Sequence, residues 1–445
     1  TGMHHVLAIQ SDGTLWAWGN NSFGQLGNGG ASDSQTPTQV QGLNDIVYVA
    51  AGSYHSFAIE SDGTLWAWGF NDSGQLGDGT TIDKYTPVEV EMIGEAVIAI
   101  AAGYNHSIAL IDDGKVYTWG SNSDGALGNG ESIPNSTNIL YPEQMECPGT
   151  GYAEAIAAGQ NRSYIIDSDA NGWAFGDNSS GRLGDGTTTN TSSPVSISTI
   201  NDIEMIAAGV GWGHHTLALL HDGTVWAWGD NERGQLGVDT ALSQTSEPIE
   251  ITSINNVVDI SAGSRHSIAL KSDGRAWVWG ANDQGQLGDD TYNDSSTPIV
   301  VEAVSNLIDA SAGGDFSIAY HALDFSGYQM VYWGSYGGYW PTYLDGPSGQ
   351  IGIAEGSDID CNGDCFGSAE EDECGDCDND SSNDCVQDCA GIWGGDLIDD
   401  CAGICDGDAV VDECGDCNGT GIEDGACDCL GTPGIQGDIS GDGII

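Results

Sequence analysis

One short stretch recurs seven times along the chain, and this recurrence limits the possible folds more than any other feature. Residues 11–27 read SDGTLWAWGNNSFGQLG and residues 61–77 read SDGTLWAWGFNDSGQLG, so fourteen of seventeen positions are identical. Each copy carries one Trp-Gly or Phe-Gly pair, and consecutive pairs are 50 to 56 residues apart. The seven pairs are Trp18-Gly19, Trp68-Gly69, Trp119-Gly120, Phe175-Gly176, Trp228-Gly229, Trp279-Gly280 and Trp333-Gly334. A period of this length is the signature of a repeat architecture.

One period, residues 46–90, predicts four short strands. The first, 46–52, is apolar, and the second, 55–60, alternates with Phe57 and Ile59 on one face. An Asp-Gly turn then predicts a tight hairpin into the third strand, TLWAWG at 64–69. A loop rich in Gly, Asn and Asp follows, and TPVEV at 86–90 is the last strand. Each period is therefore expected to form one small sheet.

A single sheet of this size cannot bury both faces, but seven sheets arranged around an axis can cover one another. The sequence therefore predicts an all-β fold, a seven-bladed β-propeller over residues 1–356. The repeated Trp residues are expected to fill the gaps between blades. The first repeat lacks its leading strand, and GQIGIAEG at 349–356 resembles that strand. We expect it to dock beside residues 5–9 and so to close the ring.

The repeat also resembles a known family. It stands as AGSYHSFAIESDGTLWAWGFNDSGQLG at 51–77 and AGSRHSIALKSDGRAWVWGANDQGQLG at 262–288, and it is similar to the regulator of chromosome condensation repeat. The resemblance covers residues 1–356 and implies a seven-bladed propeller. Its founding member is a guanine nucleotide exchange factor for Ran on chromatin, and exchange is the less favoured alternative for this chain. The superfamily also includes β-lactamase inhibitor protein II, a secreted binder.

The charge of the chain excludes several classes of partner. It holds 67 Asp and Glu against 8 Lys and Arg, a formal net charge of −59. Nucleic acid and anionic membrane surfaces both require a basic face, which eight cations cannot provide. Self-repulsion of this size suits a setting where salt or calcium offsets it. We therefore expect a secreted or cell-surface bacterial protein, without direct membrane insertion.

Histidine is the first candidate for chemistry, but its pattern favours a structural role. His5, His55, His106, His215 and His266 recur at one position of the repeat, where the other two copies have Arg162 and Phe316. Equivalent positions in seven blades form a ring around the axis, so these side chains cannot converge on one ion. We expect each imidazole to bond backbone between strands. No catalytic motif accompanies them, so the chain is predicted not to be an enzyme. An extracellular carbohydrate-active or other hydrolase is the alternative, and a converging acid pair in a pocket would favour it.

Segments that differ between copies are the better candidates for binding. VGWGH at 210–214 is an insertion that carries Trp212, and the segment at 335–346 is rich in aromatic residues. Aromatic residues in Gly-rich loops are typical recognition hot spots. The predicted binding residues are Tyr336, Tyr339, Trp340, Tyr343 and Trp212, for a protein or glycan partner at the cell surface. The alternative is that some of them only close the ring. The connections that carry the two segments are expected at opposite strand ends, so one face should dominate.

The tail begins near residue 357, where the repeats end. Between 357 and 433 it contains twelve cysteines among many carboxylates. Disulfides are favoured because the segment has an even number of cysteines and few apolar residues. Zinc at the Cys-x-x-Cys pairs 374/377 and 414/417 is the alternative. The twelve are Cys361, Cys365, Cys374, Cys377, Cys385, Cys389, Cys401, Cys405, Cys414, Cys417, Cys427 and Cys429.

The last residues, 434–445, resemble the start of a calcium loop. Asp438, Ser440 and Asp442 stand at positions 1, 3 and 5 of a dockerin or EF-hand-like loop, and Gly443 stands at position 6. The sequence therefore predicts Ca²⁺ as the cofactor of the tail. The alternative is a plain acidic, Gly-rich linker.

Overall fold

The computed structural model describes most of the first 334 residues and two short pieces of the tail. The described ranges are 1–90, 96–131, 137–149, 151–197, 199–209, 211–239, 241–302, 304–322, 328–334, 370–371 and 377–378. The chain divides into two units, and strands β1 to β26 belong to the first. No helix in the described part of the chain has the length and hydropathy for a membrane span.

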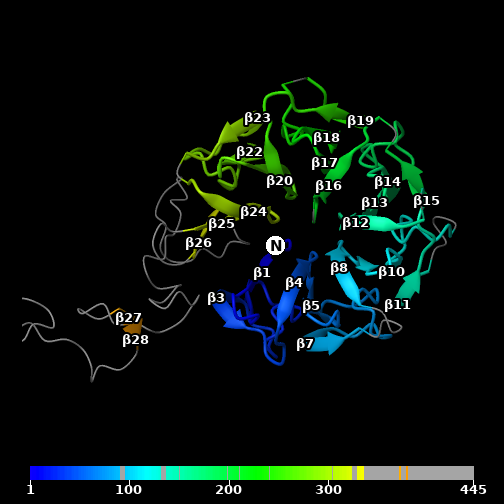
Figure 1. Ribbon diagram of the computed structural model, residues 1–445, viewed down its shortest axis with the longest axis vertical. Coiled ribbons are helices and arrows are strands. Elements are labelled where there is room, and N and C mark those ends of the chain that lie inside the picture. Colours follow the sequence, from blue (N-terminus) through cyan, green and yellow to red (C-terminus); the bar gives the residue numbers. More distant parts are fainter. Residues whose placement is uncertain are drawn as a thin grey trace, which may run out of the picture. The chain divides into compact units, whose positions relative to one another are not determined.

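Seven antiparallel sheets follow one another along the chain, and each is one blade of a ring (Figure 1). In blades 2 to 6 the four strands are hydrogen-bonded in chain order, while three strands are described in blades 1 and 7. Blade 1 contains β1 (His5–Ile9), β2 (Leu15–Gly19) and β3 (Ser34–Gln39). Blade 2 contains β4 (Ile46–Ala51), β5 (His55–Glu60), β6 (Leu65–Gly69) and β7 (Lys84–Glu89). Blade 3 contains β8 (Val97–Ala102), β9 (His106–Ile111), β10 (Val116–Gly120) and β11 (Ile139–Gln144).

The remaining blades continue the same pattern. Blade 4 contains β12 (Ala153–Ala158), β13 (Arg162–Asp167), β14 (Gly172–Gly176) and β15 (Thr191–Ser196). Blade 5 contains β16 (Ile203–Ala208), β17 (His215–Leu220), β18 (Val225–Asp230) and β19 (Gln244–Glu250). Blade 6 contains β20 (Val257–Ala262), β21 (His266–Lys271), β22 (Ala276–Gly280) and β23 (Ser295–Val300). Blade 7 contains β24 (Leu307–Ala312), β25 (Phe316–Ala322) and β26 (Tyr328–Gly334), and the tail contains β27 (Glu370–Glu371) and β28 (Cys377–Asp378).

The predicted all-β, seven-bladed propeller is thus confirmed, and the bounds of the predicted strands differ by at most two residues from those observed. The strand predicted at 86–90 is β7, which begins two residues earlier and ends at Glu89. The second strand was expected to place Phe57 and Ile59 on one face and Ser56 and Ala58 on the other, and both faces are buried. The reason is that each second strand lies in the middle of a sheet that has a neighbouring blade on both faces.

The core lies between the blades, and the repeated Trp residues fill it as predicted. Phe57 and Leu76 of blade 2 share one buried cluster with Trp119 of blade 3. The indole Nε1 of Trp119 donates a hydrogen bond of 2.8 Å to the carbonyl of Gln75. Glycine follows each such Trp or Phe because the backbone there has φ between 95° and 114°. A Cβ on Gly69 would also lie 2.6 Å from the carbonyl oxygen of Tyr54.

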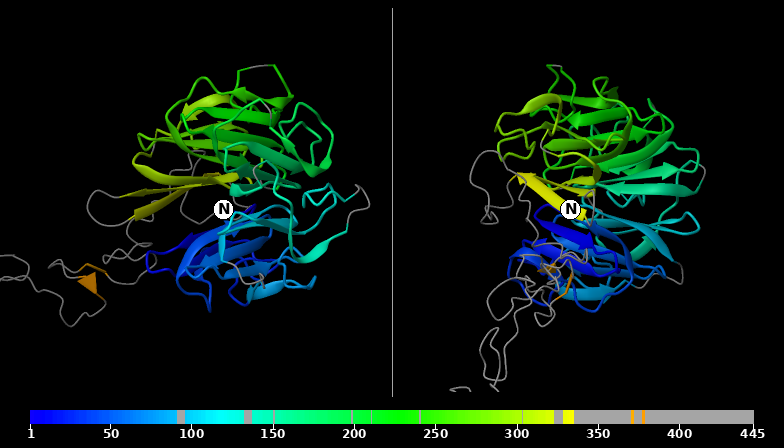
Figure 2. Two further views of the ribbon diagram at one scale, coloured as in Figure 1. Left: turned by 45° about the vertical axis from the view of Figure 1, so that its right-hand side comes forward. Right: turned by 60° about the vertical axis from the view of Figure 1, so that its left-hand side comes forward.

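The ring closes where blade 7 meets blade 1. The amide of Gly314 in blade 7 donates to the carbonyl of Met3 in blade 1 at 3.1 Å. The hydroxyl groups of Thr1 and Ser311 are 2.9 Å apart. Figure 1 shows the N-terminus near the axis, and both views in Figure 2 show the β24–β26 sheet beside the β1–β3 sheet.

The inner edge of blade 1 remains open among the described residues, since none of the described strands pairs with that edge of β1. Ile9 is 36% exposed there, whereas the equivalent Ile59 of blade 2 is 2% exposed. The predicted closing segment, 349–356, lies outside the described residues, so its docking at this edge stays a prediction. The same holds for the domain boundaries proposed at 356/357 and 433/434.

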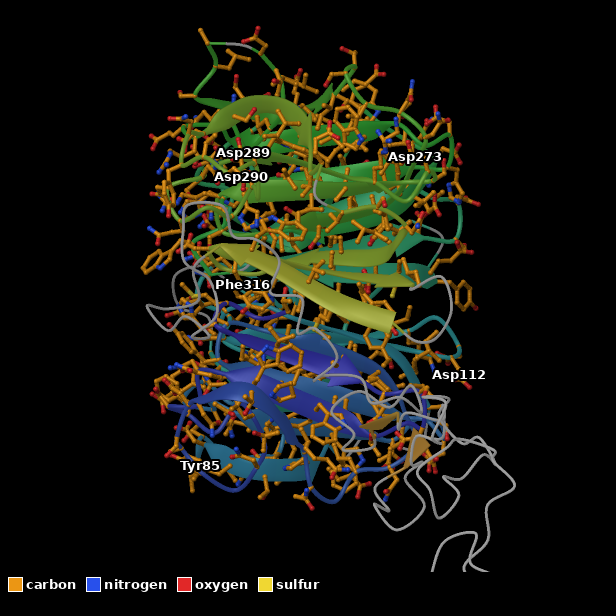
Figure 3. All side chains as sticks on the ribbon, turned by 90° about the vertical axis from the view of Figure 1, so that its left-hand side faces the viewer. Tyr85, Asp112, Asp273, Asp289, Asp290 and Phe316 are labelled. Atoms are coloured by element: carbon orange, nitrogen blue, oxygen red, sulfur yellow. The ribbon has the colours of Figure 1, made fainter. Side chains whose placement is uncertain are left out.

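Two faces of the ring follow from the strand order. The turn between the first and second strands and the connection between the third and fourth strands lie on one face, which we call the loop face. The hairpin between the second and third strands lies on the opposite face, which we call the hairpin face. Figure 3 shows Asp289 and Asp290, from a third-to-fourth connection, on one side and the hairpin residues Asp112 and Asp273 on the other.

Candidate functional site

The recurring histidines tie each blade to the next. All five are buried, and each Nε2 lies within hydrogen-bonding distance of a hydroxyl at the start of the next blade's second strand. The distances from Nε2 to Oγ are 2.9 Å for His5–Ser56, 3.4 Å for His55–Ser107, 2.9 Å for His106–Ser163, 2.9 Å for His215–Ser267 and 3.0 Å for His266–Ser317. We call this set of contacts the inner belt. Its histidines therefore have the structural role expected of them, although their main partner is a side-chain hydroxyl.

The hydroxyls of the inner belt fix the tautomer of the imidazoles. Ser107 donates its single proton to the carbonyl of Gln75 at 2.8 Å, so its Oγ can only accept from His55. Nε2 of the imidazole therefore carries a proton, and the other four pairs have the same arrangement. Burial lowers the pKa of His55 to about 3 and the pKa values of His106 and His266 to about 4. Buried, neutral and bonded in this way, these histidines have no free proton to exchange with a substrate.

Blade 4 replaces the histidine with Arg162, which makes the same connection with more bonds. Its guanidinium is fully buried and donates to the carbonyl of Gly213 at 3.0 Å and to the carbonyl of His215 at 2.7 Å. Its Nε also donates to the phenol oxygen of Tyr164 at 3.0 Å. In blade 7 the position is Phe316, which packs against Val6 of blade 1 instead.

Two carboxyl groups interact between blades 6 and 7. Burial, together with the charge of Asp309 of β24, raises the pKa of Asp259 of β20. Glycosidases keep their two carboxyl groups about 5 Å or more apart, which leaves room for the sugar or a water. No motif places a sugar or a water at Asp259 and Asp309, so the hydrolase alternative stays a hypothesis. Within the described ranges, no group of three metal-ligating side chains occurs either.

The loop face carries a continuous aromatic surface over blades 1 to 3. It consists of His4, Phe23, Tyr54, Phe70 and Tyr104, all of them half-buried. Ring centroids lie 4.7 Å apart for Phe23–Phe70, 5.3 Å for Phe23–Tyr54, 6.0 Å for His4–Tyr54 and 6.1 Å for Tyr54–Tyr104. The rings meet edge-on or tilted, which is the arrangement aromatic pairs prefer. We call these five residues the aromatic surface.

The aromatic surface is built from positions that the repeat leaves free. Tyr54 precedes the recurring histidine, and the same position is Asn161, Arg265 or Asp315 in later blades. Phe70 follows the recurring Trp-Gly pair, where later blades have Ser, Asp or Ala. The fold of a blade therefore does not require aromatic residues at these positions, yet they lie together on this part of the face. They were not predicted from the sequence, although their variation between copies was a usable signal.

Other parts of the described loop face carry ion pairs. Arg233 donates to Asp294 at 2.8 Å, and Arg182 contacts Asp177 at 2.7 Å. These arginines belong to blades 4 and 5. The loop face is thus divided between an aromatic part and an ion-paired part.

The insertion in blade 5 lies on the loop face and reaches toward the axis. A Cβ on Gly211 would lie 2.8 Å from the sulfur of Met3, so this loop packs on the first blade. Trp212 beside it is 61% exposed, and its role in binding stays a prediction. The insertion follows a first strand, and the 335–346 segment follows the third strand of blade 7, so both connections leave their strands toward the same face. The expectation that they leave at opposite ends was wrong, because alternate strands of a meander run in the same direction.

The other predicted site residues fall outside the described residues. This applies to Tyr336, Tyr339, Trp340 and Tyr343, to Asp438, Ser440 and Asp442, and to the twelve tail cysteines apart from the backbone of Cys377 in β28. Their roles in binding, calcium coordination and disulfide formation stay predictions.

The family follows from a comparison with protein-family models. Residues 1–319 match the model described as RCC1-like domain. The chain belongs to the RCC1-like domain family. Among curated relatives of this propeller, the "Ultraviolet-B receptor UVR8" of Arabidopsis thaliana is 31% identical over 291 residues, covering 64% of this chain and 53% of the receptor. The human "E3 ubiquitin-protein ligase HERC2" is 31% identical over 189 residues, covering 42% of this chain and 4% of the ligase. The RCC1-like chain thus spans about half or less of the length of these relatives.

Solved structures agree on the fold. Yeast RCC1 (Prp20), in a crystal structure with Kap60, aligns with a TM-score of 0.63 at 24% identity, covering 71% of this RCC1-like chain and 78% of that one. Human WBSCR16 aligns with a TM-score of 0.64 at 24% identity, covering 72% and 86%. Identity at this level shows a shared propeller and does not carry a partner from one chain to the other.

Proposed function

We propose that this RCC1-like propeller is a non-catalytic protein-binding module, and that it binds its partner on the loop face. The observation that carries the proposal is the aromatic surface, five contiguous half-buried rings at positions the blades do not require. Rigid aromatic side chains supply much contact area at a low cost in conformational entropy, which is why they are enriched at hot spots. The solved structures of yeast RCC1, one of them bound to Kap60, support the idea that such propellers serve as binding surfaces.

The buried histidines support the non-catalytic part of the proposal. Each of the five belt histidines is buried in a contact between blades. Histidine is the residue most often used for proton transfer, and these five cannot reach a substrate. Nucleotide exchange on a small GTPase is itself a form of protein binding, and a direct exchange assay separates it from simple docking.

The proposal is tested by selecting peptides from an unbiased displayed library on the full chain. Tyr54→Ala and Phe70→Ala should each weaken the binding of the selected peptides by about 1–3 kcal/mol if these residues are hot spots. Tyr141→Ala is the matched control, because Tyr141 is 60% exposed on the outer strand β11. Failure to enrich peptides, or peptides indifferent to Tyr54 and Phe70, would contradict the proposal.

We further propose that the propeller is an extracellular module on a stalk stiffened by disulfides and Ca²⁺, with a cell-surface partner. The support is the sequence of the tail, with its twelve cysteines, its carboxylates and the loop start at 438–443. The mass of the intact chain should barely change on alkylation without a reductant, and calorimetry of the full chain should show calcium binding. Twelve reactive thiols with stoichiometric zinc would contradict both expectations.

A further inference from the structure

We infer that the aromatic surface takes a basic polypeptide segment, with Lys or Arg side chains lying across its rings. This inference rests on the proposed function and names the partner's chemistry. The rings of Phe23, Tyr54 and Phe70 are packed against one another at tilted angles. They form a platform and not an enclosing cage. Such a platform suits a long cationic side chain laid over it, because the guanidinium stacks on ring faces and the methylene stem packs on the apolar edges.

Acidic groups belong to the same loops as the rings. The carboxylate of Asp33 accepts from the amide of Asn21 at 2.7 Å, within the loop that carries Phe23. The carboxylate of Asp83 accepts from the amide of Asn71, which follows Phe70, and Asp72 is exposed beside it. At the other end of the surface, the negative charge of Asp315 acts on His4. A cation on the rings would thus have carboxylates on more than one side.

Basic groups that could oppose such a partner are few and already used. Blades 1 to 3 contain two basic residues, Lys84 and Lys115. Lys84 contacts Asp78 at 2.9 Å, and Lys115 pairs with Asp113 in a hairpin on the opposite face. Histidine does not change this balance, because burial lowers the pKa of His4, the one histidine of the surface.

The rest of the loop face indicates where such a segment would bind. Arg182, Arg233 and Arg265 lie in the loops and turns of blades 4 to 6. Each of these arginines is paired with a carboxylate, so the position of a basic segment on the face is set by the rings of the aromatic part. With a net charge of −59, long-range attraction of a cationic segment is strong, and the rings give it a defined position.

The experiment uses the peptides selected on the full chain and asks about their composition. Enrichment in Arg and Lys, with binding that falls about tenfold or more in Tyr54→Ala, supports the inference. The decisive probe is a pair of synthetic peptides in which each Arg is kept or replaced by citrulline, which preserves shape and removes charge. The arginine peptide should bind at least tenfold more tightly than the citrulline peptide. The substitution Asp72→Asn should lower the affinity for the arginine peptide severalfold.

The main confounding effect is unspecific attraction to so acidic a protein. Asp273→Asn removes the same charge from the hairpin face and is the matched control. Equal weakening by Asp72→Asn and Asp273→Asn, together with indifference to Tyr54→Ala, would overturn the inference. If peptides depend on Tyr54 but are apolar or acidic, or bind equally with citrulline, the proposed function stands and the inference fails. If none depends on Tyr54, both fail.

Discussion

The inner belt and the aromatic surface lie next to each other, yet they are built from opposite kinds of residue. The belt uses positions that recur in blade after blade, such as His55 and its partner Ser107. The surface uses positions that vary, such as Tyr54 and Phe70. In this ring, recurrence marks residues that hold blades together, and variation marks residues left free for recognition. Mutations should therefore separate stability from binding cleanly.

The largest effect is expected at Arg162, the most extensively bonded member of the belt. Arg162→Ala would remove the donor from two buried carbonyls and from the phenol of Tyr164. Leaving such groups unpaired should lower the free energy of unfolding by about 3–4 kcal/mol, measured by urea denaturation. Arg275→Ala is the control, since Arg275 is exposed and should change stability by less than about 0.5 kcal/mol. A small loss at Arg162 would show that the belt is not what holds blades 4 and 5 together.

The second effect is a loss of stability in acid. Burial lowers the pKa of His266 to about 4, below the value of about 6.5 expected in the unfolded chain. The unfolded state therefore takes up the proton first, so the stability present above pH 6.5 is lost as the pH falls toward 4. His266→Phe should flatten this decline by about 1.4 kcal/mol per pH unit between pH 6 and 4.5. Phe is tolerated at this position in blade 7, and an unchanged slope would contradict a buried neutral imidazole.

The third effect concerns the binding surfaces. The binding of a selected peptide should weaken by about 1–3 kcal/mol in each of the variants Trp212→Ala, Tyr339→Ala and Trp340→Ala. The melting temperature should change little. Trp212 is largely exposed, so its removal leaves no cavity. Binding and thermal unfolding are measured on the same preparations. Equal losses of stability and binding would show that these side chains complete the ring and do not recognise a partner.

The smallest effect tests the open edge of blade 1. If a further strand covers β1, as the segment 349–356 is predicted to do, Ile9→Glu places a charge under that strand and should cost about 1–2 kcal/mol of stability. Val47→Glu is the comparison, because Val47 is 59% exposed and should be nearly neutral. If neither variant lowered the free energy of unfolding, the closure predicted at this edge would be contradicted.

The sequence predicted the propeller well because the blade is a local structure. The Asp-Gly turn, the Trp-Gly pair and the alternation of strands all operate within one period, so the bounds of β5 match the prediction. The aromatic surface was not predicted because its contacts join blades: Tyr54 meets Tyr104 from a position 50 residues away. The partner of His55 was missed for the same reason, since it became visible only when blades were placed side by side.

The closure at Thr1–Met3 has a consequence for the order in which the protein folds. The contact between His5 and Ser56 joins residues 51 apart, whereas that between Thr1 and Ser311 joins residues 310 apart. Closing a loop six times longer costs roughly 1.6 kcal/mol more in chain entropy. The seam between blades 7 and 1 also has a small buried core of Val6, Phe316 and Ile318. Blades should therefore assemble in sequence order with this seam formed last, and the ring should open there first, which hydrogen exchange at Val6 and Ile318 would report.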